Sequence, residues 1–208
     1  MIAGRFISLE GGEGAGKSTQ AARIAEALRD RGIEVLVTRE PGGSEGAEAV
    51  RALLLGGEIG RWSAHSEALL FAAARADHVE KKIRPALAAG AWVICDRFID
   101  SSRAYQGTQD IDDAAIQALH GFGSKGLLPD RTLVLEIGLD EGASRAAVRD
   151  AGASDRFGAR GVDFHAQVAA CFQRIAEREP DRVRLIDAAA DPDTVTARLL
   201  TALADLLP

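Results

Sequence analysis

Apolar residues along this chain fall into two kinds of pattern. Five short runs rich in Ile, Leu and Val predict buried strands at 5–9, 33–38, 91–95, 131–137 and 182–186. Between them, apolar residues recur every three or four positions and predict helices near 17–32, 45–55, 63–89, 112–122, 162–178 and 192–206, with another starting near 140. Pro85 is expected to kink or divide the long third helix. Alternating strands and helices predict a five-stranded parallel sheet covered on both faces, a three-layer α/β/α fold.

The length and net charge of the chain exclude several classes of protein. At 208 residues the chain suits a single domain, 1–208, and no apolar run approaches the roughly 18 residues of a membrane span. The formal net charge of −6 argues against nucleic-acid binding, because a phosphate backbone demands a basic face. The first residues show no basic segment followed by an apolar stretch. We therefore expect a cytoplasmic protein without a membrane or nucleic-acid partner.

The segment GGEGAGKST, residues 11–19, fits the phosphate-loop pattern G-x-x-x-x-G-K-[ST]. It follows a predicted strand and opens a predicted helix, which favours a P-loop NTPase fold. Lys17 is expected to contact the β and γ phosphates of ATP, and Ser18 to bind Mg²⁺. Asp96 ends the apolar run WVICD and is expected on the far side of the metal, through water. The whole loop is predicted to bind the nucleotide: Gly11, Gly12, Glu13, Gly14, Ala15, Gly16, Lys17, Ser18 and Thr19.

Three arginines lie where a strand or helix should face the same crevice. One triphosphate held by a phosphate loop does not require three additional arginines. Arg39, Arg75 and Arg97 therefore indicate that a second phosphate group binds here. Phe71 and Arg75 are four residues apart and share a helix face, where Phe71 either packs in the core or stacks on a planar base. Glu13 is the unexpected member of the loop, because a carboxylate beside a triphosphate costs Coulomb energy.

The absence of asparagine restricts the possible reactions. It excludes the N-K-x-D guanine signature of GTPases and the Asn of a protein-kinase catalytic loop. Phosphoryl transfer to a small acceptor and an ATP-driven mechanical step remain. The alternatives include a deoxynucleoside kinase, which would need a carboxylate base for a neutral hydroxyl, and a module that uses ATP as a switch.

Five segments, taken together, resemble the thymidylate kinase family: FISLEGGEGAGKST, TREPGGSEG, ALLFAAARADHV, DRFIDSSRAYQG and DPDTV. They occur in the family's order and spacing over nearly the whole chain. The resemblance implies transfer of the γ-phosphoryl group of Mg-ATP to dTMP, a homodimer, and a small mobile lid inserted at about 149–161. It also implies adenine contacts near residues 187–195.

The resemblance also implies roles for individual residues. Arg39 and Arg97 would hold the dTMP phosphate, Phe71 would stack on thymine, and Arg75 would bind the edge of the base. Tyr105 would pack under the deoxyribose, and Glu13 would hydrogen-bond its 3′-hydroxyl. Five further residues are expected to line the substrate site: Glu40, Pro41, Ser101, Ser102 and Gln106.

The chain departs from one version of the family pattern. Some members have an arginine after the loop acid, where this chain has Gly14. Members without it resemble this chain in having arginines in the lid, here Arg149, Arg156 and Arg160. We therefore expect Arg149 first and Arg156 second to act in catalysis with Lys17 and Arg97. A phosphate monoester is already anionic, so no general base is needed. The four histidines are expected to be structural or exposed: His65, His78, His120 and His165.

Overall fold

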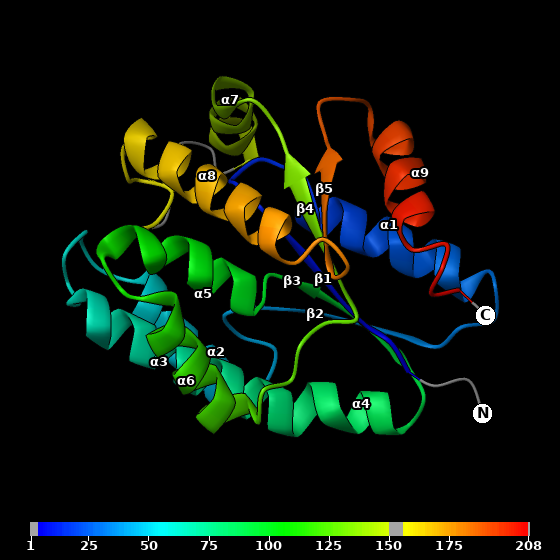
Figure 1. Ribbon diagram of the computed structural model, residues 1–208, viewed down its shortest axis with the longest axis horizontal. Helices are drawn as coiled ribbons and strands as arrows, with labels where there is room; N and C mark the ends of the chain where they lie inside the picture. Colours follow the sequence, from blue (N-terminus) through cyan, green and yellow to red (C-terminus); the bar gives the residue numbers. More distant parts are fainter. Residues whose placement is uncertain (1–3, 150–155, 208) are drawn as a thin grey trace.

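The computed structural model describes residues 4–149 and 156–207, with the side chain of Arg149 outside the described part. Its five strands form one parallel sheet in the order β2-β3-β1-β4-β5 (Figure 1). This confirms the predicted strands and their parallel arrangement. The strand bounds are β1 Phe6–Gly11, β2 Val35–Arg39, β3 Trp92–Asp96, β4 Arg131–Glu136 and β5 Val183–Asp187.

Helices connect and cover these strands. Their bounds are α1 Lys17–Arg29, α2 Glu45–Leu55, α3 Ala64–His78, α4 Arg84–Ala88, α5 Ile99–Tyr105, α6 Asp113–Ser124, α7 Leu139–Arg149, α8 Val162–Arg178 and α9 Pro192–Ala202. A π-helical turn, η1 Val79–Ile83, joins α3 to α4, and a 3₁₀ turn, η2 Gly107–Gln109, follows α5. The helix predicted over 63–89 is divided into α3, η1 and α4, and Pro85 is the second residue of α4. The sequence pattern did not predict the seven-residue helix α5.

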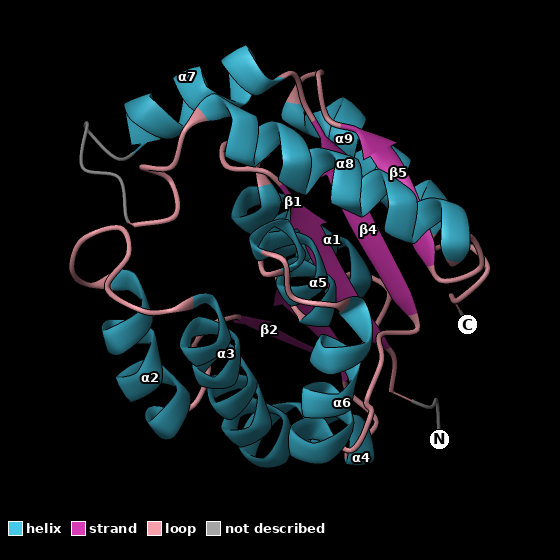
Figure 2. Ribbon diagram, turned by 60° about the vertical axis from the view of Figure 1, so that its left-hand side comes forward, coloured by secondary structure: helices cyan, strands magenta, loops and turns pink. Residues whose placement is uncertain are grey.

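Separate apolar clusters fill the two faces of the sheet. On one face, α1 and α9 pack against strand residues such as Ile7, Leu9 and Ile94. On the other, α5 and α8 cover the middle of the sheet, as Figure 1 shows. Helices α2 and α3 lie side by side beyond this second layer (Figure 2). No helix among the described residues is both long enough and apolar enough to span a membrane.

Strand register brings the predicted site residues to one edge of the sheet. Leu9 pairs with Asp96, and Asp96 pairs in turn with Arg39. The carboxyl ends of β1, β2 and β3 therefore lie at the same level, and the segments that follow them share one crevice.

Candidate active site

Positive backbone φ angles shape the phosphate loop. Gly11, Gly14 and Gly16 have φ angles of 126°, 70° and 85°, in a region that residues with a Cβ rarely adopt. A Cβ on Gly14 would also lie 2.1 Å from the carbonyl oxygen of Gly142 at the start of α7. Position 14 therefore has no room for an arginine, which gives a physical reason for this departure from the family pattern.

Lys17 is buried at the first position of α1, inside the loop. Its ammonium donates hydrogen bonds to the carbonyl oxygens of Gly12 at 2.7 Å and Gly11 at 3.2 Å. Burial, followed by the nearby positive charge of Arg97, lowers the pKa of Lys17 to about 8. A phosphate anion in the loop would favour the charged form and supply the negative partner that the buried amine needs.

Ser18 and Asp96 lie together at the edge of the loop. The Ser18 hydroxyl donates a hydrogen bond of 2.5 Å to Oδ2 of Asp96. A hydroxyl and a carboxylate are the hard oxygen donors that Mg²⁺ prefers, and both are next to the phosphate loop. The pair therefore fits the predicted magnesium site.

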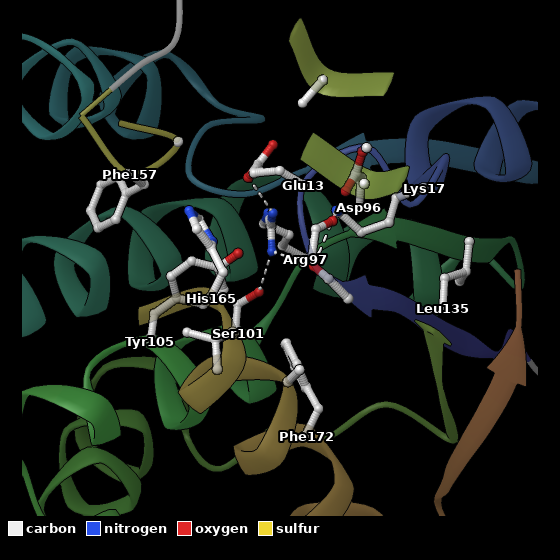
Figure 3. Close-up of a pocket in the computed structure, with 18 of the residues that line it drawn as sticks. Glu13, Lys17, Asp96, Arg97, Ser101, Tyr105, Leu135, Phe157, His165 and Phe172 are labelled. Atoms are coloured by element: carbon white, nitrogen blue, oxygen red, sulfur yellow. Dashed lines mark hydrogen bonds and ion pairs between the residues drawn. The ribbon is translucent and has the colours of Figure 1, made fainter. Parts of the chain in front are cut away.

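Arg97 connects the phosphate loop to the acceptor side. Its guanidinium donates to Glu13 at 2.8 Å, to the Gly11 carbonyl at 3.1 Å and to the Ser101 hydroxyl at 3.2 Å. It also lies over the Tyr105 ring, 5.1 Å from the centroid. Figure 3 shows Arg97 between Glu13 and Ser101. Glu13 thus turns toward Arg97, and this contact agrees with a carboxylate that serves the acceptor and not the phosphate nest.

A buried carboxylate that the sequence did not reveal supports the turn bearing Arg97. Glu10 accepts a backbone hydrogen bond from Phe98 at 2.7 Å and one from the Ser101 hydroxyl at 2.5 Å. Arg97 itself has a φ angle of 69°, uncommon for a residue with a side chain. Burial, followed by the charge of Asp100, raises the pKa of Glu10 to about 8. Glu10 holds in place the turn that aims Arg97 at the loop.

Arg75 is buried in a network of polar side chains. Its guanidinium donates to Glu40 at 2.7 Å and to the Ser102 hydroxyl at 2.8 Å. The other oxygen of Glu40 lies 3.0 Å from Nδ1 of His78, whose Nε2 lies 2.7 Å from the Thr38 hydroxyl. Glu40 therefore fixes Arg75 at the base end of the crevice, and His78 has the structural role expected of it.

Arg39 and Arg51 lie on the side of the crevice formed by β2 and α2. Arg39 donates to both oxygens of Glu48, at 3.0 and 3.1 Å, and about half of its side chain is exposed. Arg51 donates to the Pro41 carbonyl at 2.6 Å. The sequence analysis did not predict Arg51 as a site residue. Its contact with Pro41 places it beside the residues predicted to bind the acceptor phosphate.

Aromatic rings line the acceptor end. The Phe71 ring meets that of Phe157 edge to face at a centroid distance of 5.6 Å, and Tyr105 meets Phe157 at 6.2 Å. Phe157 was not predicted, since it stands in the Gly- and Arg-rich segment after α7. The rings are inclined to one another and form an apolar wall, on which the face of a single ring could stack against a nucleobase.

One large cavity, of about 1050 Å³, joins these groups. All eleven predicted substrate residues line it: Glu13, Arg39, Glu40, Pro41, Phe71, Arg75, Arg97, Ser101, Ser102, Tyr105 and Gln106. Asp96 and the phosphate loop line it too, except Ala15, which lines a second cavity of about 290 Å³ behind the loop. His165, which is half-buried, also lines the large cavity.

Of the three predicted lid arginines, Arg160 lines the large cavity, whereas Arg156 lies away from the phosphate loop. Arg149 ends α7, but its side chain and residues 150–155 lie outside the described part of the chain. Arg156 is buried, donates to the Leu54 carbonyl at 3.0 Å and lies 2.7 Å from Oε2 of Glu67. Arg156 is held by two helices and lines neither cavity, so this structure does not place it where our prediction of a catalytic role requires.

This fold and site define a P-loop protein whose phosphate loop shares one cavity with a separate group of arginines and aromatic residues. The family model described as Thymidylate kinase matches residues 9–199. The thymidylate kinase of Rhizorhabdus wittichii is 61% identical over 206 residues, which cover 99% of both chains, and that of Caulobacter vibrioides is 52% identical over 200 residues, covering 96% of this chain and 95% of the other. The crystal structure of thymidylate kinase from Ehrlichia chaffeensis has a TM-score of 0.79 and 32% identity, covering 97% of this chain and 99% of that one. The chain belongs to the thymidylate kinase family.

Proposed function

We propose that this protein transfers the γ-phosphoryl group of Mg-ATP to dTMP, giving dTDP and ADP for dTTP synthesis. The observation that carries the proposal is the single cavity in which a phosphate loop and a separate arginine and aromatic site meet. Arg97 lies at the junction, in contact with both Glu13 and Ser101. A kinase acting on a nucleoside monophosphate needs this arrangement, because two anions must approach in line.

The residues of the chain do most of the work by positioning and by charge. Lys17 would bind the terminal phosphates of ATP, and Arg97 and Arg39 would hold the acceptor phosphate and offset its repulsion from the donor. Ser18, with Asp96 through water, would hold Mg²⁺, which supplies positive charge to the β and γ phosphates when bound. No side chain has to remove a proton, because the attacking phosphate oxygen is already anionic.

Acceptor recognition follows from the rest of the cavity. Phe71 would stack on thymine, while Arg75, held by Glu40 and Ser102, would donate to its edge. Tyr105 would pack under the deoxyribose and leave no room for a 2′-hydroxyl. Glu13 would accept from the 3′-hydroxyl.

The adenine of ATP fits the second cavity. That cavity lies behind the phosphate loop and is lined by Ala188, Ala190 and Pro192 from the segment predicted to bind adenine. Arg145 of α7 lines its other side. Planar guanidinium groups stack on aromatic rings, so Arg145 would cover the base.

A homodimer would account for two exposed apolar side chains, one on α3 and one on α6. Phe122 is 93% exposed and Leu69 is 56% exposed. Helices α3 and α6 pack closely, since a Cβ on Gly123 would lie 3.2 Å from Cβ of Ala76. These side chains would be buried against a second copy of the chain. The proposed substrates, dTMP and ATP, are consistent with a cytoplasmic enzyme.

The direct test is ADP release from Mg-ATP with separate acceptors. We expect fast turnover with dTMP, slower turnover with dUMP, and none with thymidine or without an acceptor. Turnover with thymidine would identify a nucleoside kinase, and ATP hydrolysis indifferent to every acceptor would favour a switch module. Either of these two results would overturn the proposal.

A further inference from the structure

Another buried carboxylate, Glu67, lies beside the acceptor end of the cavity. It stands one helical turn before Phe71 on α3, and its side chain is 1% exposed. One oxygen accepts hydrogen bonds from the side-chain amides of Gln106 at 3.1 Å and Gln109 at 2.8 Å. The other lies 2.7 Å from Nη2 of Arg156 and 3.4 Å from Nη2 of Arg160. Glu67 is therefore shared by α3, the α5–η2 segment and the segment before α8.

The carboxylate determines which way the Gln106 amide points. A carboxylate flanked by two arginines can only accept hydrogen bonds, so it must face the NH₂ group of the amide. The opposite orientation would bring two oxygens together. Gln106 is 1% exposed and lines the cavity, and its Oε1 has no hydrogen-bond partner among the described residues. The amide donor is therefore engaged by Glu67, while its acceptor is buried and unsatisfied in a side chain that borders the cavity.

An acceptor at this position distinguishes pyrimidine bases. Thymine and uracil carry a ring N–H that can donate to Oε1, whereas the corresponding ring nitrogen of cytosine is an acceptor. A buried acceptor facing another acceptor leaves both without a partner, which costs more than a missing contact at the surface. The orientation of Gln106 thus affects which base is bound.

We propose that Glu67 is a positioning residue for base selection: it fixes the Gln106 amide so that its carbonyl oxygen faces the acceptor base, favouring a pyrimidine with a ring N–H over cytosine. The inference rests on the proposed dTMP kinase function. Arg156 and Arg160 supply the positive charge that a buried carboxylate needs. They also belong to the turn that carries Phe157 against Phe71. Arg156 would then act behind the acceptor pocket, as a partner of Glu67, and not on the transferred phosphoryl group.

The test compares dTMP with dCMP in Glu67→Gln. A neutral amide at position 67 can donate to the Gln106 oxygen, so the Gln106 amide is free to turn over. We expect the ratio of kcat/KM for dTMP to that for dCMP to fall at least about tenfold, mostly through a higher KM for dTMP. Calorimetric binding of both nucleotides gives the same ratio if turnover with dCMP is too slow to measure. Glu67→Asp keeps an acceptor-only group and is expected to retain most of the selectivity.

Controls separate this role from a structural one. Glu80→Gln makes the same chemical change at an exposed carboxylate and should leave the ratio unchanged. In a Gln106→Ala background, Glu67→Gln should change the ratio less than about twofold, because coupled residues are not additive. If Glu67→Gln does not fold, the double variant Glu67→Leu/Arg156→Met can be used, because it replaces the buried ion pair by apolar groups. It should show the same loss of selectivity for dTMP over dCMP.

Two different failures can be told apart. A wild-type protein with dTMP-dependent ADP release, together with an unchanged ratio in Glu67→Gln, would overturn this inference alone. The inference would also be overturned if Glu67→Gln changed the dTMP to dCMP ratio equally in the wild-type and Gln106→Ala backgrounds. A wild-type protein without dTMP-dependent ADP release would overturn the proposed function and this inference together.

Discussion

The carboxylate of Glu13 accepts a hydrogen bond of 2.8 Å from Nη2 of Arg97. The contact spans the crevice from the phosphate loop to the turn after β3 (Figure 3). An acid in a phosphate loop would repel a triphosphate if it pointed into the nest of backbone N–H groups. With Arg97 as its partner, Glu13 can remain beside the nucleotide at a smaller electrostatic cost and face the acceptor.

Substituting Glu13→Gln tests this orientation. The variant keeps a hydrogen-bonding group but loses the charge that strengthens the contacts with Arg97 and the deoxyribose hydroxyl. We expect the KM for dTMP to rise about tenfold, equivalent to about 1.4 kcal/mol, and the KM for ATP to change less than about threefold. Steady-state kinetics with each substrate varied in turn measures both. Equal changes in the two KM values would place Glu13 in the phosphate nest.

Arg75 and Arg39 are expected to contribute differently to the free energy of unfolding, because Arg75 is buried and Arg39 is half-exposed. Arg75 and Glu40 are each 4% exposed, so Arg75→Ala leaves a buried carboxylate without its main partner. We expect a loss of about 3–5 kcal/mol in the free energy of unfolding. Arg39 pairs with Glu48 at the surface, so Arg39→Ala should cost about 1 kcal/mol or less. Urea denaturation of both variants without ligand measures the difference, and similar losses would contradict the buried network.

The raised pKa of Glu10 predicts a pH dependence of stability. Its folded pKa of about 8 lies above the ordinary value of 4.5, so between these values the folded state binds more protons than the unfolded state. This group's contribution to the free energy of unfolding should therefore decline as pH rises from 5 to 8, by at most about 1.4 kcal/mol per pH unit. Glu10→Gln cannot titrate and should remove this decline.

Denaturant unfolding at pH 5, 6, 7 and 8 measures the difference between wild type and Glu10→Gln. The series stops at pH 8 because Lys17, with a folded pKa lowered to about 8, makes the stability rise with pH above that value. Parallel pH profiles for the two proteins would show that Glu10 does not titrate in this range.

The sequence predicted the strands and most of the site because both depend on local patterns. The glycines and Lys17 of the phosphate loop stand at fixed spacing, and Arg39 and Asp96 lie at the ends of apolar strands whose parallel register brings them together. Helix α5 was missed because it is a single short helix stabilised by packing against α8. Glu10 and Glu67 were missed because their importance comes from buried partners distant in the sequence, such as Phe98 and Arg156. The position of Arg156 was likewise unpredictable, since either Glu67 or a phosphate can bind a guanidinium.

The exposed ring of Phe122 predicts the effect of a charge at position 122. Phe122→Asp places a carboxylate where the proposed homodimer would bury an aromatic ring, so we expect a shift from dimer to monomer in sedimentation at micromolar concentration. The monomer should remain folded, because the substituted side chain is exposed within the chain. Leu185→Asp, at an exposed apolar residue on β5, is a matched control and should stay dimeric. A wild-type protein that is monomeric would rule out the dimer.

The pairing of Ser18 with Asp96 predicts how the enzyme responds to its metal. Asp96→Asn removes the negative charge but keeps an oxygen beside the Ser18 hydroxyl. We expect the Mg²⁺ concentration for half-maximal turnover to rise at least about tenfold, because a neutral amide attracts the hydrated cation less strongly than a carboxylate does. The KM for dTMP at saturating Mg²⁺ should change little, since dTMP binds through other residues. ADP release measured across a Mg²⁺ titration gives the first value, and removal of the metal with a chelator should abolish turnover in both proteins. An unchanged Mg²⁺ requirement in Asp96→Asn would mean that this carboxylate serves only as a partner of Ser18.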